Sequence, residues 1–379
     1  MIRSLSTLAF VALFLVSLGC NSRPAFESQP LFVSGTHGVN IFRIPSLMVT
    51  PSGAVLAFAE AREGGDKSPT DLAIRRSEDG GKTWGPMRII QRGKPGAIMN
   101  PTPVVDHRTG VIYLICNLVD RDAGRDEIWM LTSTDNGETW SGPIDLTPMV
   151  GPVHPGPGVG LQLASGRLVV PGRVADNTGG SVVVYSDDGG ATWLRGASVA
   201  PDTNESQAAE LSDGRLMINM RSTRGQGCRA VAISEDGGET WGTLYDDHAL
   251  VEPVCQGSLV RYTAVAERRR LLRGMFSRRP EPTTRLLFSN PARSQRGDRN
   301  AMTVRISEDD GKTWSYARTV HPEGSSYSCL TQLPNGDIGL LYERQKRRDE
   351  HWHMEIHFAR FNLAWVMEPL KIESDGPPR

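Results

Sequence analysis

The fold of this chain depends on the stretch Ser77-Glu78-Asp79-Gly80-Gly81-Lys82-Thr83-Trp84, because the chain repeats it four more times. All copies read Ser-x-Asp-x-Gly-x-Thr-Trp, and the later ones begin at Ser133, Ser186, Ser234 and Ser307. In such a segment the Ser, Asp and Thr oxygens can bond nearby backbone N–H groups, while Gly adopts a positive φ. The Trp indole then covers the apolar face of a small sheet. This interpretation makes structural turn formers of the five acids Asp79, Asp135, Asp188, Asp236 and Asp309.

Short apolar runs separated by turn signals fill the sequence between these copies. The first pair, Phe42 to Val49 and Ala54 to Ala59, flanks Thr50-Pro51-Ser52-Gly53, which predicts two strands joined by a turn. The copies begin roughly 50 to 70 residues apart, a period that suits one propeller blade of four short strands. Because the sequence has no long amphipathic helix, charge-rich linker or low-complexity segment, we expect one all-β domain over residues 31–368.

The composition is that of an ordinary globular protein. Its 379 residues include 42 Lys and Arg and 43 Asp and Glu, so the charges nearly cancel and nothing indicates a nucleic-acid partner. The basic runs Arg268-Arg269-Arg270 and Lys346-Arg347-Arg348 are interpreted as solvated hairpin tips. Four cysteines lie beyond residue 20, namely Cys116, Cys228, Cys255 and Cys329. They lack metal-type spacing, so buried free thiols are favoured, and one disulfide remains the alternative.

The first 20 residues predict an export signal. Arg3 supplies a positive start, and the apolar run from Leu5 to Leu18 leads to Gly19-Cys20. A Cys in this position resembles a bacterial lipoprotein signal, in which Cys20 is lipidated and becomes the mature N-terminus. Plain cleavage is the alternative, because Ser17 stands where such signals usually carry Leu. We therefore expect the protein at the outer surface, in the periplasm or secreted, with a flexible tether at residues 21–30 and a short tail at residues 369–379.

A second motif carries a family resemblance. Phe42-Arg43-Ile44-Pro45 resembles the Arg-bearing start motif of the exo-sialidases (neuraminidases, glycoside hydrolase family 33), which also carry multiple copies of the octapeptide, known there as the Asp-box or BNR repeat. Further stretches agree in order, namely Ala59-Glu60-Ala61-Arg62, Met99-Asn100-Pro101, Asn204-Glu205-Ser206-Gln207, Asn219-Met220-Arg221-Ser222, Tyr327-Ser328-Cys329-Leu330 and Leu341-Tyr342-Glu343-Arg344. The resemblance implies a six-bladed β-propeller of four-stranded antiparallel blades. It further implies hydrolysis of terminal α-linked sialic acid from glycoconjugates, with neither metal nor organic cofactor.

The substrate of that family explains the arginines. The anomeric carbon of sialic acid bears a carboxylate, and planar, always-charged guanidinium groups can hold a carboxylate bidentately. By the resemblance, these groups belong to Arg43, Arg221 and Arg299. Arg296 is the alternative for the third, but similar sequences place the Arg three residues before Met-Thr, and that position is Arg299.

A neutral nucleophile suits this anionic substrate better than a carboxylate would. By the resemblance, Tyr327 is the nucleophile and Glu205 its base, and the reaction proceeds with retention through a covalent glycosyl-tyrosine. Asp66 would protonate the leaving oxygen and later activate water, and nearby Asp71 is the alternative acid. Three further residues have supporting roles: Arg62 and Asn100 line the pocket, and Glu343 pairs with Arg43.

Other functions fit parts of this pattern. A trans-sialidase, an intramolecular trans-sialidase or a hydrolase of deaminated sialic acid would use the same residues. A non-catalytic Asp-box propeller that binds glycan or protein is the alternative from another class. His351, His353, Glu355 and His357 alternate, so on a strand they would share one face and could bind a metal, although any solvated edge strand gives the same pattern.

Overall fold

The structure is a computed structural model that describes residues 23–66, 68–175, 180–199, 201–263, 285–345 and 354–369. Within these residues the chain is all-β apart from two short helices, α1 (Thr147–Val150) and α3 (Leu363–Met367). The prediction of an all-β chain is confirmed. The described part contains no helix long and apolar enough to cross a membrane. The predicted export signal with Cys20, both basic runs, His351 and His353 lie outside the described residues.

Residues 41–145 form one sheet, in which the strands follow the order of the chain. Its strands are β2 (Ile41–Val49), β3 (Val55–Arg62), β4 (Thr70–Ser77), β5 (Arg88–Gln91), β6 (Ala97–Val105), β7 (Ile112–Asp120), β8 (Arg125–Ser133) and β9 (Ile144–Asp145). Antiparallel pairing runs from β2 to β5 and again from β6 to β9. The two groups are joined by a single parallel pair, Thr70 with Ala97.

Two smaller antiparallel sheets follow. One contains β10 (Val153–Pro155), β11 (Leu161–Gln162), β12 (Leu168–Val174), β13 (Ser181–Ser186) and β14 (Leu194–Arg195). The other contains β15 (Thr203–Glu210), β16 (Leu216–Ser222), β17 (Cys228–Ser234) and β18 (Tyr245–Val251). The second sheet has its strands side by side in chain order, as hairpin-connected strands do. In the first sheet, β10 and β11 both pair with β12, which is followed by β13 and β14.

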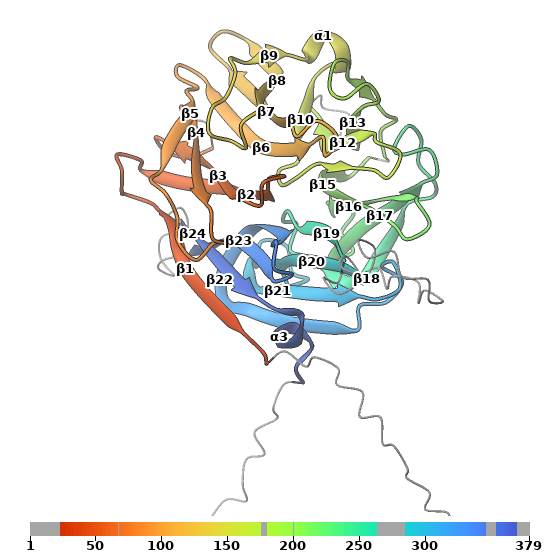
Figure 1. Cartoon of the computed structure of the whole chain (residues 1–379). Coiled ribbons are helices and arrows are strands. Elements are labelled where there is room, and N and C mark those ends of the chain that lie inside the picture. The colour runs from red at the N-terminus through yellow and green to blue at the C-terminus, as the bar shows by residue number, and fades with distance from the viewer. Residues whose placement is uncertain are drawn as a thin grey trace, which may run out of the picture.

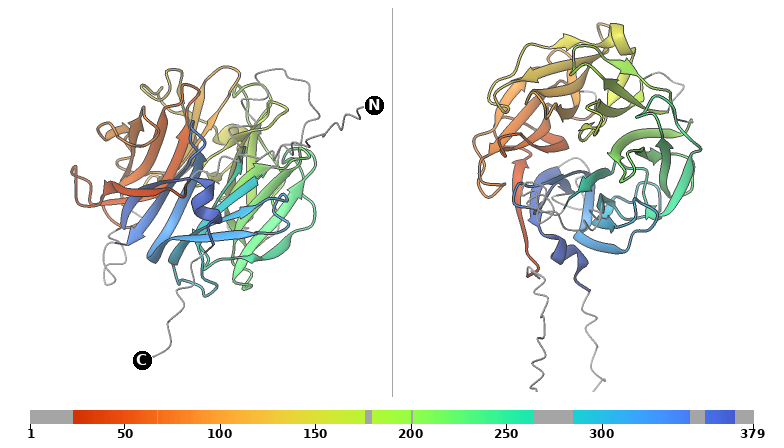
Figure 2. Two further views of the ribbon diagram at one scale, coloured as in Figure 1. Left: turned by 60° about the horizontal axis from the view of Figure 1, so that its bottom comes forward. Right: turned by 45° about the vertical axis from the view of Figure 1, so that its right-hand side comes forward.

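The last sheet contains both ends of the domain. Its strands are β19 (Ser258–Tyr262), β20 (Arg285–Pro291), β21 (Asn300–Ser307), β22 (Tyr316–Gln332), β23 (Ile338–Gln345), β24 (Met354–Phe361) and β1 (Phe26–Val33). The first part of β22 pairs with β21 and the second part with β23. The innermost strands contact one another in a closed sequence, from β2 through β6, β12, β15 and β19 to β22 and back to β2. Figure 1 shows the sheets following one another around the molecule in this order, and Figure 2 gives two further views.

The expected tether at residues 21–30 is wrong from Phe26 onward. Strand β1 pairs antiparallel with β24, so the first described strand completes the last sheet. The Phe26 ring stacks on Trp365 with centroids 4.5 Å apart, which fixes the start of the strand. The polar residues that suggested a tether, such as Ser28 and Gln29, lie on an edge strand whose outer side faces solvent.

The Asp-boxes form identical turns. In the first copy, Ser77 Oγ accepts from Gly81 N at 2.8 Å, and Asp79 accepts from Thr83 N at 2.9 Å and from Thr83 Oγ1 at 2.6 Å. The corresponding bonds recur in the other four copies. These bonds lower the pKa of every Asp-box carboxyl, to about 2 for Asp135. The turns are thus structural, as predicted.

The fifth residue of each Asp-box explains why Gly is fixed there. Gly81 has φ of 85°, and a Cβ atom at this position would lie 2.3 Å from the Phe358 ring on β24. In the other four copies, a Cβ atom at the Gly in fifth position would lie 2.4 to 2.8 Å from a side chain of another strand, namely Leu56, Tyr113, Val183 or Met217. Trp84 packs edge-on against the same Phe358 ring at 5.1 Å. Each Asp-box therefore closes its own hairpin and also packs against a neighbouring group of strands.

Candidate active site

Four inner strands are irregular where the family-like motifs occur. The register shifts lie between Arg43 and Ser46, Met99 and Thr102, Thr203 and Ser206, and Ser325 and Ser328. A bulge leaves a residue unpaired and re-aims its side chain. Ile44 and Asn100 have φ of 58° and 55°, a conformation that costs free energy for residues with a side chain. The bulges thus turn one polar side chain from each strand toward a common space.

That space is a cavity of about 820 Å³. Eight of the nine predicted site residues line it, namely Arg43, Arg62, Asp66, Asn100, Glu205, Arg221, Arg299 and Tyr327. The ninth, Glu343, is fully buried and bonded to Arg43. Neither alternative residue contributes to the lining, because Arg296 is outside it and Asp71 accepts from Gly93 N and pairs with Arg92.

Arg43 is fixed in place by a buried ion pair with Glu343. Arg43 Nε donates to Glu343 Oε1 at 2.6 Å, across strands β2 and β23. Glu343 also accepts from the backbone N–H groups of Ile44 at 2.8 Å and Tyr327 at 3.1 Å. Burial alone would raise the pKa of Glu343, but the Arg43 charge and these three bonds hold it below its usual value. One carboxylate therefore positions an arginine and the tyrosine strand together.

Tyr327 is bonded to both Glu205 and Arg221. Its hydroxyl donates to Glu205 Oε1 at 2.5 Å and accepts from Arg221 Nη1 at 3.1 Å. Arg221 Nη1 also donates to Glu205 Oε2 at 2.7 Å. Burial and the Glu205 charge raise the pKa of Tyr327 well above its ordinary value, and the Arg221 charge only partly opposes them. The phenol is thus protonated at neutral pH, with a carboxylate base on its proton.

Arg299 completes a set of three guanidinium groups around Tyr327. It donates to Ser326 Oγ at 3.1 Å and to the Val254 carbonyl at 3.2 Å, and both partners are neutral. The Arg43 and Arg299 guanidinium carbons lie 5.5 and 5.7 Å from the centroid of the Tyr327 ring. Within the described residues no carboxylate pairs with Arg299, whereas Arg43 and Arg221 each have one. Arg221 Nε is also buried and has no hydrogen-bond partner among the residues that the structure describes. The group is therefore suited to bind an anion.

Asp66 lies at the opening of the cavity. Its side chain is 60% exposed and forms an ion pair with Arg62. Arg62 is itself held by Glu60, to which its Nε donates at 2.7 Å. Glu60 also accepts from Asn100 N at 2.7 Å, and Asn100 Nδ2 donates to Asn117 Oδ1 at 3.1 Å. Glu60 belongs to a family-like motif, but the sequence predicted no role for it. A carboxylate that lies behind an arginine is not marked in the sequence by anything except its position in a strand.

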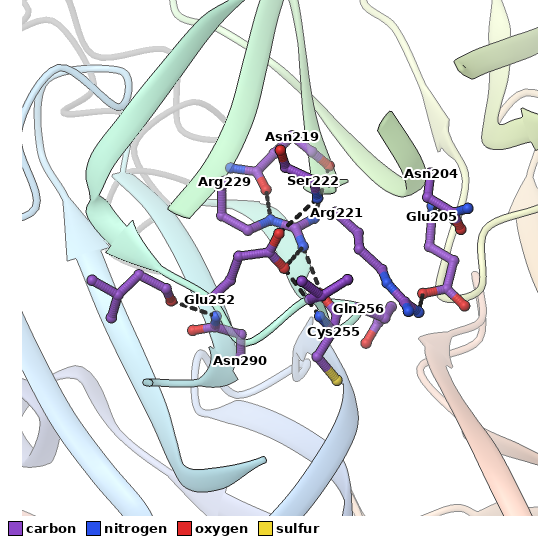
Figure 3. A network of polar contacts seen from close by, with 12 residues as sticks. Asn204, Glu205, Asn219, Arg221, Ser222, Arg229, Glu252, Cys255, Gln256 and Asn290 are labelled. Atoms are coloured by element: carbon purple, nitrogen blue, oxygen red, sulfur yellow. Dashed lines mark hydrogen bonds and ion pairs between the residues drawn. The ribbon is translucent and has the colours of Figure 1, made fainter. Parts of the chain in front are cut away.

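A further buried ion pair lies behind Arg221 (Figure 3). Arg229 on β17 and Glu252 are bonded at 3.1 Å, and both are essentially inaccessible to solvent. Glu252 accepts from Ser222 N at 2.6 Å, next to Arg221, and from Cys255 N at 3.1 Å. Burial raises the pKa of Glu252. This pair ties the Arg221 strand to the segment whose Val254 carbonyl binds Arg299. The sequence analysis missed it because no local motif marks it.

The remaining predictions concern thiols and metals. Cys116, Cys228, Cys255 and Cys329 are buried and free, as favoured. In the described part of the proposed histidine face, His357 bonds to Glu355 at 3.2 Å. No group of three or more His, Cys, Asp or Glu among the described residues is arranged to hold a metal ion.

Comparison with known proteins assigns this arrangement to a family. A family model described as a BNR repeat-like domain matches residues 53–340. An exo-alpha-sialidase of Arthroderma benhamiae is 30% identical over 393 residues, which covers 91% of this chain and 89% of that protein. The chain belongs to the sialidase family. The sequence-based assignment to this family, and to its enzyme class, the glycoside hydrolases, is therefore confirmed.

Two further sialidases extend the comparison. A sialidase of Micromonospora viridifaciens is 35% identical over 376 residues, and the match covers 90% of this chain but 55% of that protein. The solved structure of the Hadza microbial sialidase Hz136 is 28% identical and superposes with a TM-score of 0.77, covering 89% of this chain and 69% of that one. This chain thus spans little more than half the length of the Micromonospora sialidase.

Proposed function

We propose that the protein hydrolyses terminal α-linked sialic acid from glycoconjugates, with retention, through a covalent bond to Tyr327. The observation that carries the proposal is the 2.5 Å hydrogen bond from the Tyr327 hydroxyl to Glu205. It lies among three guanidinium groups, one of which has no carboxylate partner within the described residues. A sugar carboxylate would supply the missing counter-charge and would place the anomeric carbon beside the phenol oxygen.

The raised pKa of Tyr327 gives Glu205 its role. A phenol with so high a pKa is a poor nucleophile until a base removes its proton as the bond to carbon forms. Glu205 is already bonded to that proton, and Arg221 donates to the same hydroxyl oxygen and stabilises the developing negative charge. In this scheme the phenolate never accumulates, and substrate and nucleophile do not repel each other.

Asp66 would act as acid and then as base at the leaving oxygen. Its exposed position lets the carboxyl reach a glycosidic oxygen above the cavity. The ion pair with Arg62 keeps the side chain directed toward the lining residues. Breaking the glycosyl-tyrosine bond then needs a water that Asp66 activates on the face from which the leaving group departed, opposite Tyr327. The two successive displacements give retention.

For the fold we propose a six-bladed propeller. Support comes from the closed sequence of contacts among the inner strands β2, β6, β12, β15, β19 and β22. The single parallel pair between β4 and β6, and the two pairing partners of β22, divide the larger sheets into smaller antiparallel groups. Export, with or without lipidation at Cys20, remains a proposal, and fractionation of the producing cell tests it.

The test is turnover of a fluorogenic α-sialoside by the purified protein. We expect Tyr327→Phe and Asp66→Ala each to lower kcat by roughly 10²- to 10⁴-fold, with an unchanged circular dichroism spectrum. Tyr245→Phe is the matched control, since Tyr245 is 43% exposed and lies outside the cavity lining, and it should retain full activity. A folded wild-type protein without turnover on this sialoside and its deaminated analogue would favour a non-catalytic binding module instead.

A further inference from the structure

The cavity has a second wall that the proposed reaction does not use. It consists of Arg121, Arg125, Asp126, His154 and Arg173, which we call the cationic wall. Arg121 lies in the turn between β7 and β8, and Arg125 and Asp126 are the first two residues of β8. His154 and Arg173 are paired across β10 and β12. None of these residues belongs to a sialidase-like motif of the sequence.

One of the three arginines in this wall is neutralised. Arg125 donates to both oxygens of Glu127, at 2.7 and 2.8 Å, in a bidentate pair. Such a pair leaves little net charge for a ligand. The free positive charge of the wall must therefore come from the other two arginines.

Among the described residues, Arg173 reaches a carboxylate only through the imidazole of His154. Its Nη2 donates to His154 Nδ1 at 2.6 Å, and His154 Nε2 is 2.7 Å from Asp126 Oδ1. Since an arginine has no acceptor, Nδ1 must be the unprotonated nitrogen, and Nε2 donates to Asp126. The imidazole is thus neutral in this arrangement, and it separates the guanidinium from the acid. The second contact of Arg173, from Nη1 to the Val174 carbonyl, is a long 3.4 Å.

Arg121 has even fewer contacts. Its side chain is exposed and, within the described residues, forms neither an ion pair nor a side-chain hydrogen bond. Asp126 is the one acid among the five wall residues, and its carboxylate is bonded to His154 and not to an arginine of the wall. Within the part of the chain that the structure describes, the wall therefore presents two arginines that lack a direct carboxylate partner, and it shares its cavity with the three arginines around Tyr327.

We propose that the cationic wall binds a second sugar-borne oxyanion of the substrate, a carboxylate or a sulfate. The inference rests on the proposed sialidase function, in which the first carboxylate occupies the group around Tyr327. A cavity of about 820 Å³ lies in the upper part of the range for ligand pockets, so it has room for more than one charged group. The oxyanion can belong to the terminal sialic acid, as a sulfate ester, or to a second sialic acid on the leaving side.

The test compares three substrates in which the linkage of sialic acid to lactose is the same. Sialyllactose is the reference, and the two dianionic substrates are its sulfated form, with the ester on the sialic acid, and α2,8-disialyl-lactose. We expect wild-type kcat/KM to be roughly fivefold to tenfold higher for at least one dianionic substrate. Arg121→Gln and Arg173→Gln should each lower that ratio about threefold, and added salt should lower it further. The control Arg108→Gln removes a 74% exposed arginine outside the cavity lining and should keep the ratio.

The two sources of the oxyanion give different patterns. Preference for the sulfated substrate alone assigns the wall to the terminal sialic acid, and preference for the disialyl substrate alone assigns it to the leaving side. A ratio near one in the wild type, unchanged in Arg121→Gln and Arg173→Gln, overturns the proposal. Because Arg121 is exposed, its variant should fold even where Arg173→Gln does not.

Binding separates this proposal from the proposed function. Calorimetric titration of Tyr327→Phe with the same three ligands measures affinity while turnover is slow. Tighter binding of a dianionic ligand, abolished by adding Arg121→Gln, supports the wall even where the wild type hydrolyses nothing. Hydrolysis of sialyllactose without any preference in binding would support the sialidase and reject the wall.

Discussion

The Asp-box turns and the cavity use the same kinds of polar side chain in opposite ways. In a turn, the bonds of the Ser hydroxyl and the Asp carboxylate join residues at most four positions apart, and both carboxylate oxygens of Asp79 accept within the octapeptide. In the cavity, Arg43 and Glu343 are 300 positions apart and Glu205 and Tyr327 are 122 apart. The Ser and Asp side chains of a turn thus need no ligand, whereas within the described residues Arg299 in the cavity has no carboxylate partner. Side chains that distant segments bring together, with positive charge left over, therefore distinguish the cavity from the turns.

The largest effect should come from removing one charge beneath the cavity. Glu343→Gln leaves Arg43 buried without a counter-charge, so we expect unfolding free energy to fall by about 3 to 5 kcal/mol and kcat/KM to fall with it. Urea denaturation and turnover of the fluorogenic sialoside measure the two. The same change at Glu27, a 72% exposed partner of Arg360, should cost less than about 1 kcal/mol. Equal costs at both positions would contradict the distinction between cavity and surface.

A smaller effect should separate two adjacent glycines of one turn. Gly81→Ala places a methyl group against the Phe358 ring at a positive φ, and we expect a loss of about 2 to 4 kcal/mol. A Cβ atom at Gly80 would meet nothing within 4 Å, so Gly80→Ala should cost only about 1 kcal/mol. Thermal denaturation of both variants makes the comparison. Similar losses would mean that backbone conformation, and not packing between groups of strands, explains why the fifth position of the Asp-box is Gly.

The smallest effect should be visible only as a function of pH. Asp135 has a folded pKa of about 2, against about 3.9 in an unfolded chain, so its charge stabilises the fold above pH 4. That stabilisation is lost as the pH falls from about 4 to about 2. Asp135→Asn should therefore be about 1 kcal/mol less stable than wild type at pH 7, and the gap should narrow below pH 4. Denaturation at several pH values measures the gap, and a gap independent of pH would contradict this role.

What the sequence could predict follows the same division. The Asp-boxes and the strand pairs around them depend on residues close in sequence. Their periodicity and turn chemistry were therefore sufficient to predict them. The family resemblance predicted five residues that line one cavity, and three of them, Arg43, Glu205 and Tyr327, lie on inner strands. The other two are Arg221 on β16 and Arg299 directly before β21. The start of the domain was misplaced, since β1 is defined only by pairing with β24 at the other end of the chain.

Contacts behind and beside the motifs were beyond sequence reasoning. The Arg229–Glu252 pair joins two segments that no spacing relates, and its members appear in the sequence as ordinary charged residues. The cationic wall is similar, because Arg121 and Arg173 line one cavity only through the arrangement of the β7–β8 turn and strands β10 and β12. For two positions the sequence offered a preferred residue and an alternative, Arg299 or Arg296 and Asp66 or Asp71. In both cases the preferred residue lines the cavity and the alternative does not.

The central claim is that Tyr327 forms the bond to sugar. A sialyl fluoride carrying a second fluorine at C3 tests it, because that fluorine slows both steps and fluoride leaves readily, so the intermediate accumulates. Mass spectrometry of the digested protein should find the fluorosialyl group on the peptide containing Tyr327, and Tyr327→Phe should show no adduct. An adduct on Glu205 or Asp66, or turnover of the natural linkage without any adduct, would contradict the account.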